Sequence, residues 1–305
     1  MQASVIIPAW GDTPHLDEAL DRLGAQTMTD FETILASPPP GRTDAGAARN
    51  AGLDRAKGEW VFFVDADDLP EPDFLSAAIE AGERTNADIV AFRADEVDDR
   101  LGIRSPMTYL RRIVPWADGA PHSVDELGRA RFTTLGLPPW NKAVRRSFLL
   151  RNGIRFQSIR RSNDVAFTVE LMAKAKTFTA LDSSLIGYRV NNPKSLQATN
   201  SATPTCFYDA LLEAKRRLRG DLADAMNALA EETIFYHLHS VRTLDSYREL
   251  HGFLLTRASA DFGVDIPAST FKGLGNVAFK VGRALETLRD RGPFFCMMRL
   301  IGKMA

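Results

Sequence analysis

The chain has 305 residues, and its 38 lysines and arginines nearly balance its 39 aspartates and glutamates, for a formal net charge of -1. Apolar residues make up 45% of the chain and charged residues 25%, which is typical of a folded globular protein and excludes a disordered or collagen-like one. A nearly neutral chain has no bulk attraction for nucleic acid, so we expect no nucleic-acid partner.

The sequence also bears on the cellular location. No apolar run reaches the roughly 20 residues that cross a bilayer, and the first residues lack the basic start of a secretory signal. The two cysteines, Cys206 and Cys296, are too few for a disulfide framework or a cysteine-based zinc site. We therefore expect a cytoplasmic enzyme.

Short apolar runs alternate with helical patterns over the first hundred residues. The patterns predict strands at 3–7, 31–36, 60–64 and 88–92 and helices at 16–23, 45–56 and 72–84. Three prolines make residues 37–41 a loop, because proline donates no backbone hydrogen bond. Strands that alternate with helices indicate an α/β fold with a doubly wound, mostly parallel, Rossmann-like sheet, which binds ligands beyond the carboxyl ends of its strands.

The pattern is weaker between residues 95 and 140, where we expect one helix, near 123–134. Helices are predicted at 147–152 and 164–174, and two short strands are predicted within 177–189. Residues 204–256 show helical stripes and no strong strand signal. The chain should therefore end in a helical extension.

Asp65-Ala66-Asp67-Asp68 directly follows the most apolar strand. Carboxylates this close repel one another unless a cation neutralises them, and oxygen ligands of this kind suit Mg²⁺ or Mn²⁺. The alternative is a turn followed by a helix cap, which aspartate also favours. We interpret Asp68 as a cap, and Asp65 with Asp67 as a metal site, because capping explains only one carboxylate.

An ordered set of motifs extends from residue 3 to about residue 197. It comprises SVIIP at 4–8, QT-x-TDFE at 26–32, ARNAG at 48–52, GEWVFFVDADD at 58–68, WNK at 140–142, RSFL at 146–149, NGI-x-F at 152–156, NDVAF at 163–167 and YR-x-NNP-x-SL at 188–196. Together these motifs resemble glycosyltransferase family 2, and the later ones resemble its bacterial polysaccharide branch. The family has the GT-A fold and transfers a sugar from a nucleotide diphosphate with inversion of configuration.

The resemblance implies a GT-A catalytic domain over residues 1–200, in which 1–95 bind the nucleotide sugar and 96–200 carry the acceptor and base half, followed by a helical region over 201–305. It implies that Asp164 is the catalytic base and that Asp67 is the main metal ligand, with Asp65 on the metal or the ribose. The donor would contact Pro8, Ala9, Trp10, Ser37, Arg49, Asp65 and Ala66. The acceptor would contact Trp140, Asn141, Lys142 and Asn163.

Each of these roles has a structural alternative. Asp164 could be a helix cap, Arg49 could belong to a surface ion pair, and Trp140 could be a core residue rather than a platform for a sugar ring. The chain also departs from the family. Ser37 and three prolines replace the usual Asp-Asp-Gly-Ser segment, whose first aspartate contacts uracil, and Asn163 stands where glutamate is more common. UDP is thus the expected nucleotide only by family resemblance.

These observations predict an inverting, metal-dependent glycosyltransferase of bacterial surface polysaccharide synthesis, which takes a nucleotide-sugar donor and a glycan or lipid-linked acceptor. The alternative is a non-catalytic relative that binds a nucleotide or a glycan and scaffolds a biosynthetic complex. A nucleotidyltransferase is disfavoured, because residues 8–14 lack a glycine-rich loop with a basic residue.

The C-terminal residues 272–305 carry seven basic and two acidic side chains. Val277, Val281, Leu285 and Leu288 recur at helical spacing, and a basic amphipathic helix suits the surface of an anionic membrane. We therefore expect peripheral contact with the inner face of the cytoplasmic membrane. Packing of the apolar stripe on the catalytic domain is the alternative.

Overall fold

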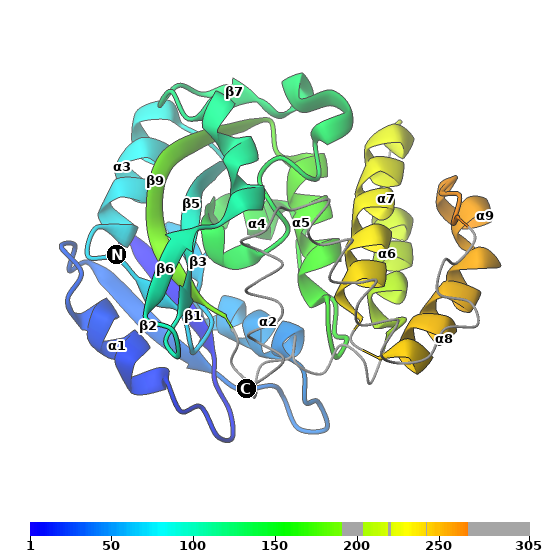
Figure 1. Cartoon of the computed structure of the whole chain (residues 1–305). Helices are drawn as coiled ribbons and strands as arrows, with labels where there is room; N and C mark the ends of the chain where they lie inside the picture. The colour runs from blue at the N-terminus through cyan, green and yellow to red at the C-terminus, as the bar shows by residue number, and fades with distance from the viewer. Residues whose placement is uncertain (191–203, 219–220, 242, 268–305) are drawn as a thin grey trace. The chain divides into compact units, whose positions relative to one another are not determined.

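The computed structural model (Figure 1) describes residues 1–190, 204–218, 221–241 and 243–267. The chain divides into two compact units, of which the first comprises residues 1–190 with 209–229 and the second comprises residues 191–208 with 230–305.

The centre of the first unit is a sheet whose strands follow the order β2, β1, β3, β8, β5, β9, β4. β6 pairs with β5, and β7 pairs with β9. The strands are β1 (Ala3–Pro8), β2 (Phe31–Ala36), β3 (Trp60–Phe63), β4 (Leu69–Pro70), β5 (Ile89–Asp98), β6 (Ile103–Pro106), β7 (His122–Ser123), β8 (Lys142–Arg145) and β9 (Thr177–Arg189). β1 and β3 are buried along their whole length, as their apolar runs predict.

The sheet is mixed. β1 is parallel to β2 and β3, and β5 is parallel to β9, but β8 is antiparallel to both of its neighbours, β3 and β5. β4, β6 and β7 also pair in antiparallel fashion. The α/β class is as predicted, whereas the expectation of a mostly parallel sheet is not met. A four-residue strand with two apolar residues gives too short a pattern to reveal β8 in the sequence.

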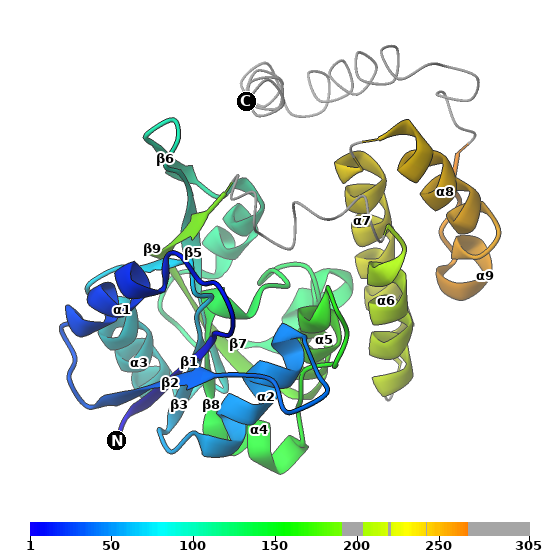
Figure 2. The same ribbon diagram turned by 90° about the horizontal axis from the view of Figure 1, so that it is seen from below.

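Helices cover both faces of this sheet (Figure 2). α1 (Leu16–Gly24) and α3 (Phe74–Thr85) lie on one side, and α2 (Ala45–Arg55), α4 (Arg146–Asn152) and α5 (Asn163–Lys174) lie on the other. Successive side chains of β3 enter the two layers, as the twofold period of a strand requires. The ring centroid of Phe62 lies 5.1 Å from that of Phe74 in α3, and the centroid of Phe63 lies 5.5 Å from that of Phe167 in α5.

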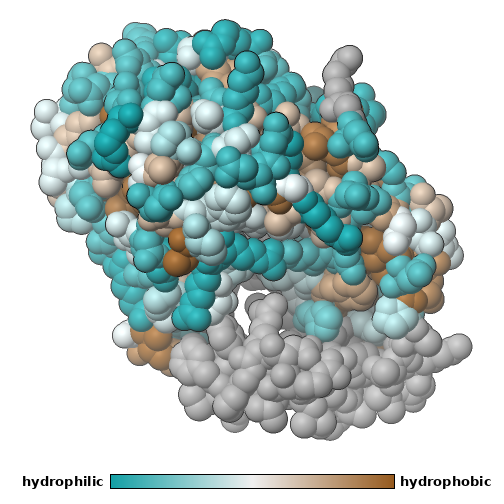
Figure 3. Space-filling model, turned by 90° about the horizontal axis from the view of Figure 1, so that it is seen from above, coloured by the Kyte–Doolittle hydropathy of each residue, from teal (hydrophilic) through white to brown (hydrophobic). Residues whose placement is uncertain are grey.

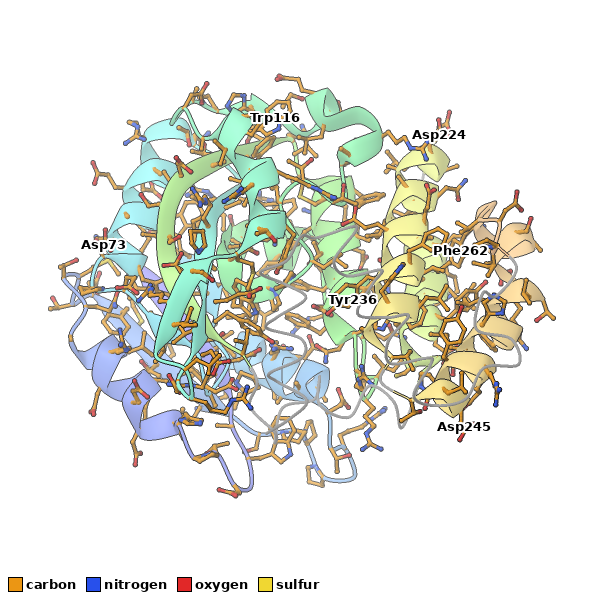
Figure 4. The ribbon with its side chains drawn as sticks, in the orientation of Figure 1. Asp73, Trp116, Asp224, Tyr236, Asp245 and Phe262 are labelled. Carbon is orange, nitrogen blue, oxygen red and sulfur yellow. The ribbon has the colours of Figure 1, made fainter. Side chains whose placement is uncertain are left out.

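The region with the weak pattern is folded against the sheet. β5 continues to Asp98 and pairs with β9 over most of its length, with shifts of register on either side of Arg93, so β9 is one strand rather than the two predicted. Three short 3-10 helices follow: η1 (Thr108–Trp116), η2 (Val124–Ala130) and η3 (Pro139–Asn141). η1 ends at Trp116 (Figure 4), whose ring packs against those of His122 and Phe178. η2 is shorter than the predicted helix at 123–134, and Gly128, with φ 50°, interrupts it with a kink.

The C-terminal region is helical where it is described, as predicted. Its helices are α6 (Cys206–Arg217), α7 (Ala223–Ser240), α8 (Leu244–Leu255) and α9 (Ala258–Phe262). In the second unit the buried Tyr208 donates a hydrogen bond to Asp261 at 2.7 Å and lies edge-on to Phe253 and Phe262.

A search of the described residues for a membrane span finds no helix with the necessary length and apolar character. The basic tail at 272–305, for which we expect membrane contact, lies outside the described residues. The face in Figure 3 is mainly hydrophilic, with apolar residues in small separate groups.

α2 approaches its neighbours closely because two of its residues lack a side chain. A Cβ atom on Gly46 would lie 2.2 Å from the carbonyl oxygen of Gln157, and one on Gly52 would lie 2.4 Å from a methyl carbon of Ile6 in β1. Both distances are far inside the usual separation of nonbonded atoms. The helix can therefore contact both β1 and the segment before α5.

We predict that Gly46→Ala destabilises the protein by about 1–3 kcal/mol, because the new methyl group meets a backbone atom that cannot rotate away. Gly24→Ala at the end of α1 is a matched control, since a Cβ atom there would have no neighbour within 4 Å. The control should change the free energy of unfolding by less than about 0.5 kcal/mol. Urea unfolding of the two variants tests the prediction, and equal stability would contradict it.

Candidate functional site

The parallel register of β1, β2 and β3 brings three strand ends to one edge of the sheet. Pro8 at the end of β1 pairs with Ala36 at the end of β2, and Ile6 of β1 pairs with Phe63 of β3. The amide of Ala9 continues the pairing by donating to the carbonyl of Ala36 at 2.9 Å. The residues that follow these strands include the predicted donor contacts Pro8, Ala9, Trp10, Ser37, Asp65 and Ala66.

The loops after β1 and β2 contact each other directly. The hydroxyl of Ser37 donates a hydrogen bond to the carbonyl of Ala9 at 3.1 Å. Trp10 beside it is 38% exposed. The edge therefore offers an aromatic surface and a hydroxyl, but no carboxylate at position 37.

Residues 65–68 form a tight turn after β3. The amide of Asp68 donates to the carbonyl of Asp65 at 3.1 Å, and the carboxylate of Asp68 accepts from the amide of Asp65 at 3.3 Å. Asp68 is fully buried, and its Oδ1 has no hydrogen-bond partner among the described residues. Burial raises the pKa of Asp68 well above its usual value, and the nearby charges of Asp65 and Asp67 raise it further.

The prediction that Asp68 caps a helix is wrong. The next helix, α3, begins at Phe74, and Asp73 precedes it (Figure 4). The carboxylate of Asp68 instead closes its own turn, which a local sequence pattern cannot distinguish from a cap.

Arg49 of α2 connects this turn to α5. Its guanidinium forms an ion pair with Asp65 and donates a hydrogen bond to Oδ1 of Asn163 at 2.7 Å. Arg49 is buried, and its charge lies 5.3 Å from the ring centroid of Phe156. The alternative of a surface ion pair is therefore excluded, and one predicted donor residue, Arg49, contacts both another, Asp65, and a predicted acceptor residue, Asn163.

The segment before α5 is held to α2 by side chains. The side-chain amide of Asn50 donates from Nδ2 to the carbonyl of Phe156, and its Oδ1 accepts from the backbone amide of Phe156, both at 2.9 Å. Asp44 caps α2 by accepting from Ala47 at 2.8 Å and also accepts from the hydroxyl of Ser158 at 2.7 Å. Helix α2 thus fixes both the residues that lead to α5 and the position of Arg49.

Asp164 lies in the first turn of α5. The cap position is Ser162, which has φ 57°, so the alternative that Asp164 itself caps the helix is wrong. Burial raises the pKa of Asp164, and the positive charges of Arg49 and Lys142 oppose this rise. A half-buried carboxylate with a raised pKa is suited to accept a proton.

The burial of Trp140, Asn141 and Lys142 conflicts with direct contact between these side chains and an acceptor. Trp140 is almost fully buried and stacks against Tyr188, with ring centroids 5.1 Å apart. Asn141 donates to the carbonyls of Leu135 and Phe92, and Lys142 donates three hydrogen bonds within the protein. Burial lowers the pKa of Lys142 to about 7, while the charge of Asp164 opposes this shift. The sequence could not show that these three side chains are buried, because a short motif does not reveal the burial of its lysine.

Arg189, for which the sequence motifs predict no role, also contacts the acidic turn. This buried residue ends β9, and its Nε donates to the carbonyl of Asp67 at 3.1 Å. Its guanidinium also pairs with Glu18 of α1, at 2.7 Å, and with Asp99. The only signal in the sequence was its place in the YR motif.

The acidic turn at residues 65–68 contains the predicted metal ligands. In the described part of the chain, no three histidine, cysteine, aspartate or glutamate side chains are placed together to hold a metal ion. The turn nevertheless has mutually repelling carboxylates and an orphaned carboxylate oxygen on Asp68. Mg²⁺ commonly uses one or two carboxylates and takes its other ligands from substrate phosphates. Asp65 and Asp67 fit such a partial site.

Comparison with known proteins gives consistent matches. Residues 39–149 match the family model described as glycosyl transferase family 2. The chain is 28% identical over 219 residues to the uncharacterized glycosyltransferase EpsJ of Bacillus subtilis, a match that covers 63% of this chain and 62% of EpsJ. It is 23% identical over 253 residues to the poly(ribitol-phosphate) beta-N-acetylglucosaminyltransferase TarS of Staphylococcus aureus, which covers 74% of this chain and 42% of TarS. The matches thus span less than two thirds of either relative.

Solved structures support the same architecture. Residues 1–349 of S. aureus TarS, in complex with UDP-GlcNAc, superpose with a TM-score of 0.63 at 18% identity, over 96% of this chain and 88% of that one. The mannosyltransferase PcManGT from Pyrobaculum calidifontis, in complex with GDP-Man and Mn²⁺, gives a TM-score of 0.55 at 15% identity, over 99% and 84%. At these identities the likeness establishes the fold alone, and the predicted GT-A type is confirmed.

Proposed function

We propose that the chain acts as a member of glycosyltransferase family 2 and transfers a sugar, with inversion, from a nucleotide-diphosphate donor to a hydroxyl of a glycan or lipid-linked acceptor in surface polysaccharide synthesis. One observation carries the proposal: Arg49 joins Asp65, at the strand edge that would bind the donor, to Asn163, the neighbour of Asp164. The expected donor-binding edge and the proposed base would therefore belong to one charged network.

On the donor side, the loops that contain Trp10 and Ser37 would hold the nucleoside, and the diphosphate would lie beside Asp65 and Asp67. Arg49 is already paired with Asp65, so its charge would stabilise that carboxylate when the phosphates approach. A divalent cation held by Asp65 and Asp67 would supply positive charge to the diphosphate as it leaves.

On the acceptor side, the carboxylate of Asp164 would take the proton from the attacking hydroxyl. The hydroxyl oxygen forms its bond to the anomeric carbon while the bond to the diphosphate breaks, so the sugar inverts in a single displacement. A carboxylate accepts this proton readily when its pKa is raised toward the working pH. Burial supplies that rise for Asp164, and Arg49 and Lys142 limit it.

The relatives support the substrate class without fixing the substrate. TarS is named for the transfer of N-acetylglucosamine to poly(ribitol phosphate), and we extend from it only the broad class of cell-surface glycan acceptors. The exposed Ser37 has no carboxylate with which to contact the nucleotide base, and this favours the alternative of a non-catalytic scaffold. The half-buried Asp164, which the charge of Arg49 reaches, favours catalysis, because a scaffold has no need of a proton acceptor.

We predict that transfer depends on a divalent cation. A chelator should abolish turnover. Asp67→Asn should lower kcat/KM by a factor that corresponds to several kcal/mol of lost transition-state stabilisation, since an amide is a poorer metal ligand. Asp73→Asn is a matched control, because that side chain makes no capping hydrogen bond at the start of α3. Release of the nucleotide diphosphate can be measured with several nucleotide sugars and Mn²⁺. Full activity in excess chelator would disprove the metal requirement.

Asp164→Asn keeps the shape of the side chain but removes the base, so turnover should fall by about 10²–10⁴-fold with donor affinity nearly unchanged. Because the base must be unprotonated, activity should fall as the pH drops through the raised pKa of Asp164. The acidic limb of the wild-type pH profile should therefore lie above the pKa of about 3.9 of an ordinary aspartate. Stopped assays from pH 4 to 9 test this. Loss of donor affinity with turnover intact would assign Asp164 a structural role.

The loop after β2 is expected to discriminate only weakly between nucleotide bases. With serine at position 37, calorimetric titration with UDP, GDP, CDP and dTDP should show weak discrimination, because no charged group accepts a hydrogen bond from the base there. Ser37→Asp should improve the affinity for UDP relative to CDP by about tenfold or more. A strong preference of the wild-type chain for UDP would mean that other groups recognise uracil.

A further inference from the structure

The segment that precedes η3 has an unusual arrangement of hydrogen bonds. Four consecutive carbonyl oxygens in it each accept from a side chain. The donors are Asn141 to Leu135 at 2.9 Å, Lys142 to Gly136 at 2.8 Å, Thr168 to Leu137 at 2.7 Å, and Lys142 to Pro138 at 2.8 Å. The path of residues 135–138 is therefore set by three side chains from three elements, η3, β8 and α5.

Lys142 is the centre of this arrangement. It begins β8 in the middle of the sheet and is 1% exposed. Its third hydrogen bond, of 2.6 Å, goes to Oδ1 of Asn141, the same side chain that donates to Leu135. A buried ammonium group is tolerated only when its hydrogens are satisfied, and all three hydrogens of Lys142 bind oxygens within residues 136–141.

The same segment is tied to the helix that carries the proposed base. Thr168, which binds the carbonyl of Leu137, is fully buried and lies four residues after Asp164 in α5. Residues four apart lie on the same side of a helix. A displacement of residues 135–138 would therefore act on the face of α5 that includes Asp164.

We propose that Lys142 is a positioning residue for the transfer reaction. Its ammonium group shapes residues 135–141, and through Thr168 this segment fixes the position of Asp164. The role rests on the proposed function, because it concerns the base of that reaction. It replaces direct acceptor binding as the function of the WNK motif.

Lys142 also contributes to the charge around Asp164. The charged groups that act on Asp164 are Arg49 of α2, Asp65 after β3 and Lys142 of β8. Arg49 and Lys142 favour the carboxylate, and Asp65 disfavours it. Loss of Lys142 should therefore move the acidic limb of the pH profile to higher pH, an effect that a purely mechanical support would not have.

The experiment compares three substitutions in the full chain. Lys142→Met removes the charge and three hydrogen bonds at similar volume. Thr168→Val removes only the link from α5 to Leu137. Lys174→Met is the control, because Lys174 lies at the far end of α5 and Glu170, its partner, keeps a second ion pair with Arg217. Each variant is assayed for turnover, UDP affinity, pH profile and hydrogen exchange of residues 135–141 and 160–168.

We expect Lys142→Met to lower turnover by about 10–100-fold, because small misplacements of a catalytic group carry costs of that order. UDP affinity should stay within about twofold, hydrogen exchange should accelerate in both segments, and the acidic limb should move to higher pH. Thr168→Val should lower turnover less and should leave the limb in place. Lys174→Met should match the wild type in every measurement.

Wild-type turnover and exchange in a folded Lys142→Met variant would overturn the proposal, as would equal losses of UDP affinity and turnover. If Lys142→Met does not fold, Thr168→Val decides, and unchanged exchange around Asp164 in that variant would overturn the proposal. Absence of transfer by the wild type with every donor would contradict the proposed function instead. The exchange of residues 160–168 would then decide the positioning role by itself.

Discussion

A buried arginine constrains most of the site. Arg49 carries a permanent charge into the space between α2, the turn after β3 and the start of α5, where the charge is stable only with partners. Asp65 supplies the opposite charge, Asn163 supplies a neutral acceptor, and the ring of Phe156 lies beside the guanidinium. These three partners come from segments far apart in the sequence, so satisfying one side chain requires that all of them be in place.

The rest of α2 serves the same requirement. Gly46 and Gly52 let the helix approach Gln157 and Ile6, and Asp44 caps its start while binding Ser158. This close approach brings Arg49 within reach of both the turn at residues 65–68 and the start of α5. Packing therefore explains the ARNAG motif as much as chemistry does. Its small residues let α2 lie close to its neighbours, and this closeness allows Arg49 to reach its partners.

The sequence predicted the parts of the fold whose signal is local. The apolar run of β3 and the acidic residues directly after it identified one edge of the sheet, and the parallel order of β1, β2 and β3 followed from alternation with helices. What it missed depends on contacts between distant segments. The reversed strand β8 is too short to show a pattern, and the burial of Asp68 and the partners of Arg189 exist only once several elements have packed together. Motif recognition named these residues without revealing what they touch.

The paired hydrogen bonds between Asn50 and Phe156 have a chemical consequence. The side-chain amide acts as a single rung of a β-ladder, offering one donor and one acceptor to a backbone that has no strand beside it. Aspartate has nearly the same shape but offers only acceptors, so its oxygen would face the carbonyl of Phe156. Deamidation of Asn50 would therefore turn an attraction into a repulsion in the segment before α5, with no change in side-chain size. The loss of one amide nitrogen during storage would thus weaken the contact between α2 and that segment.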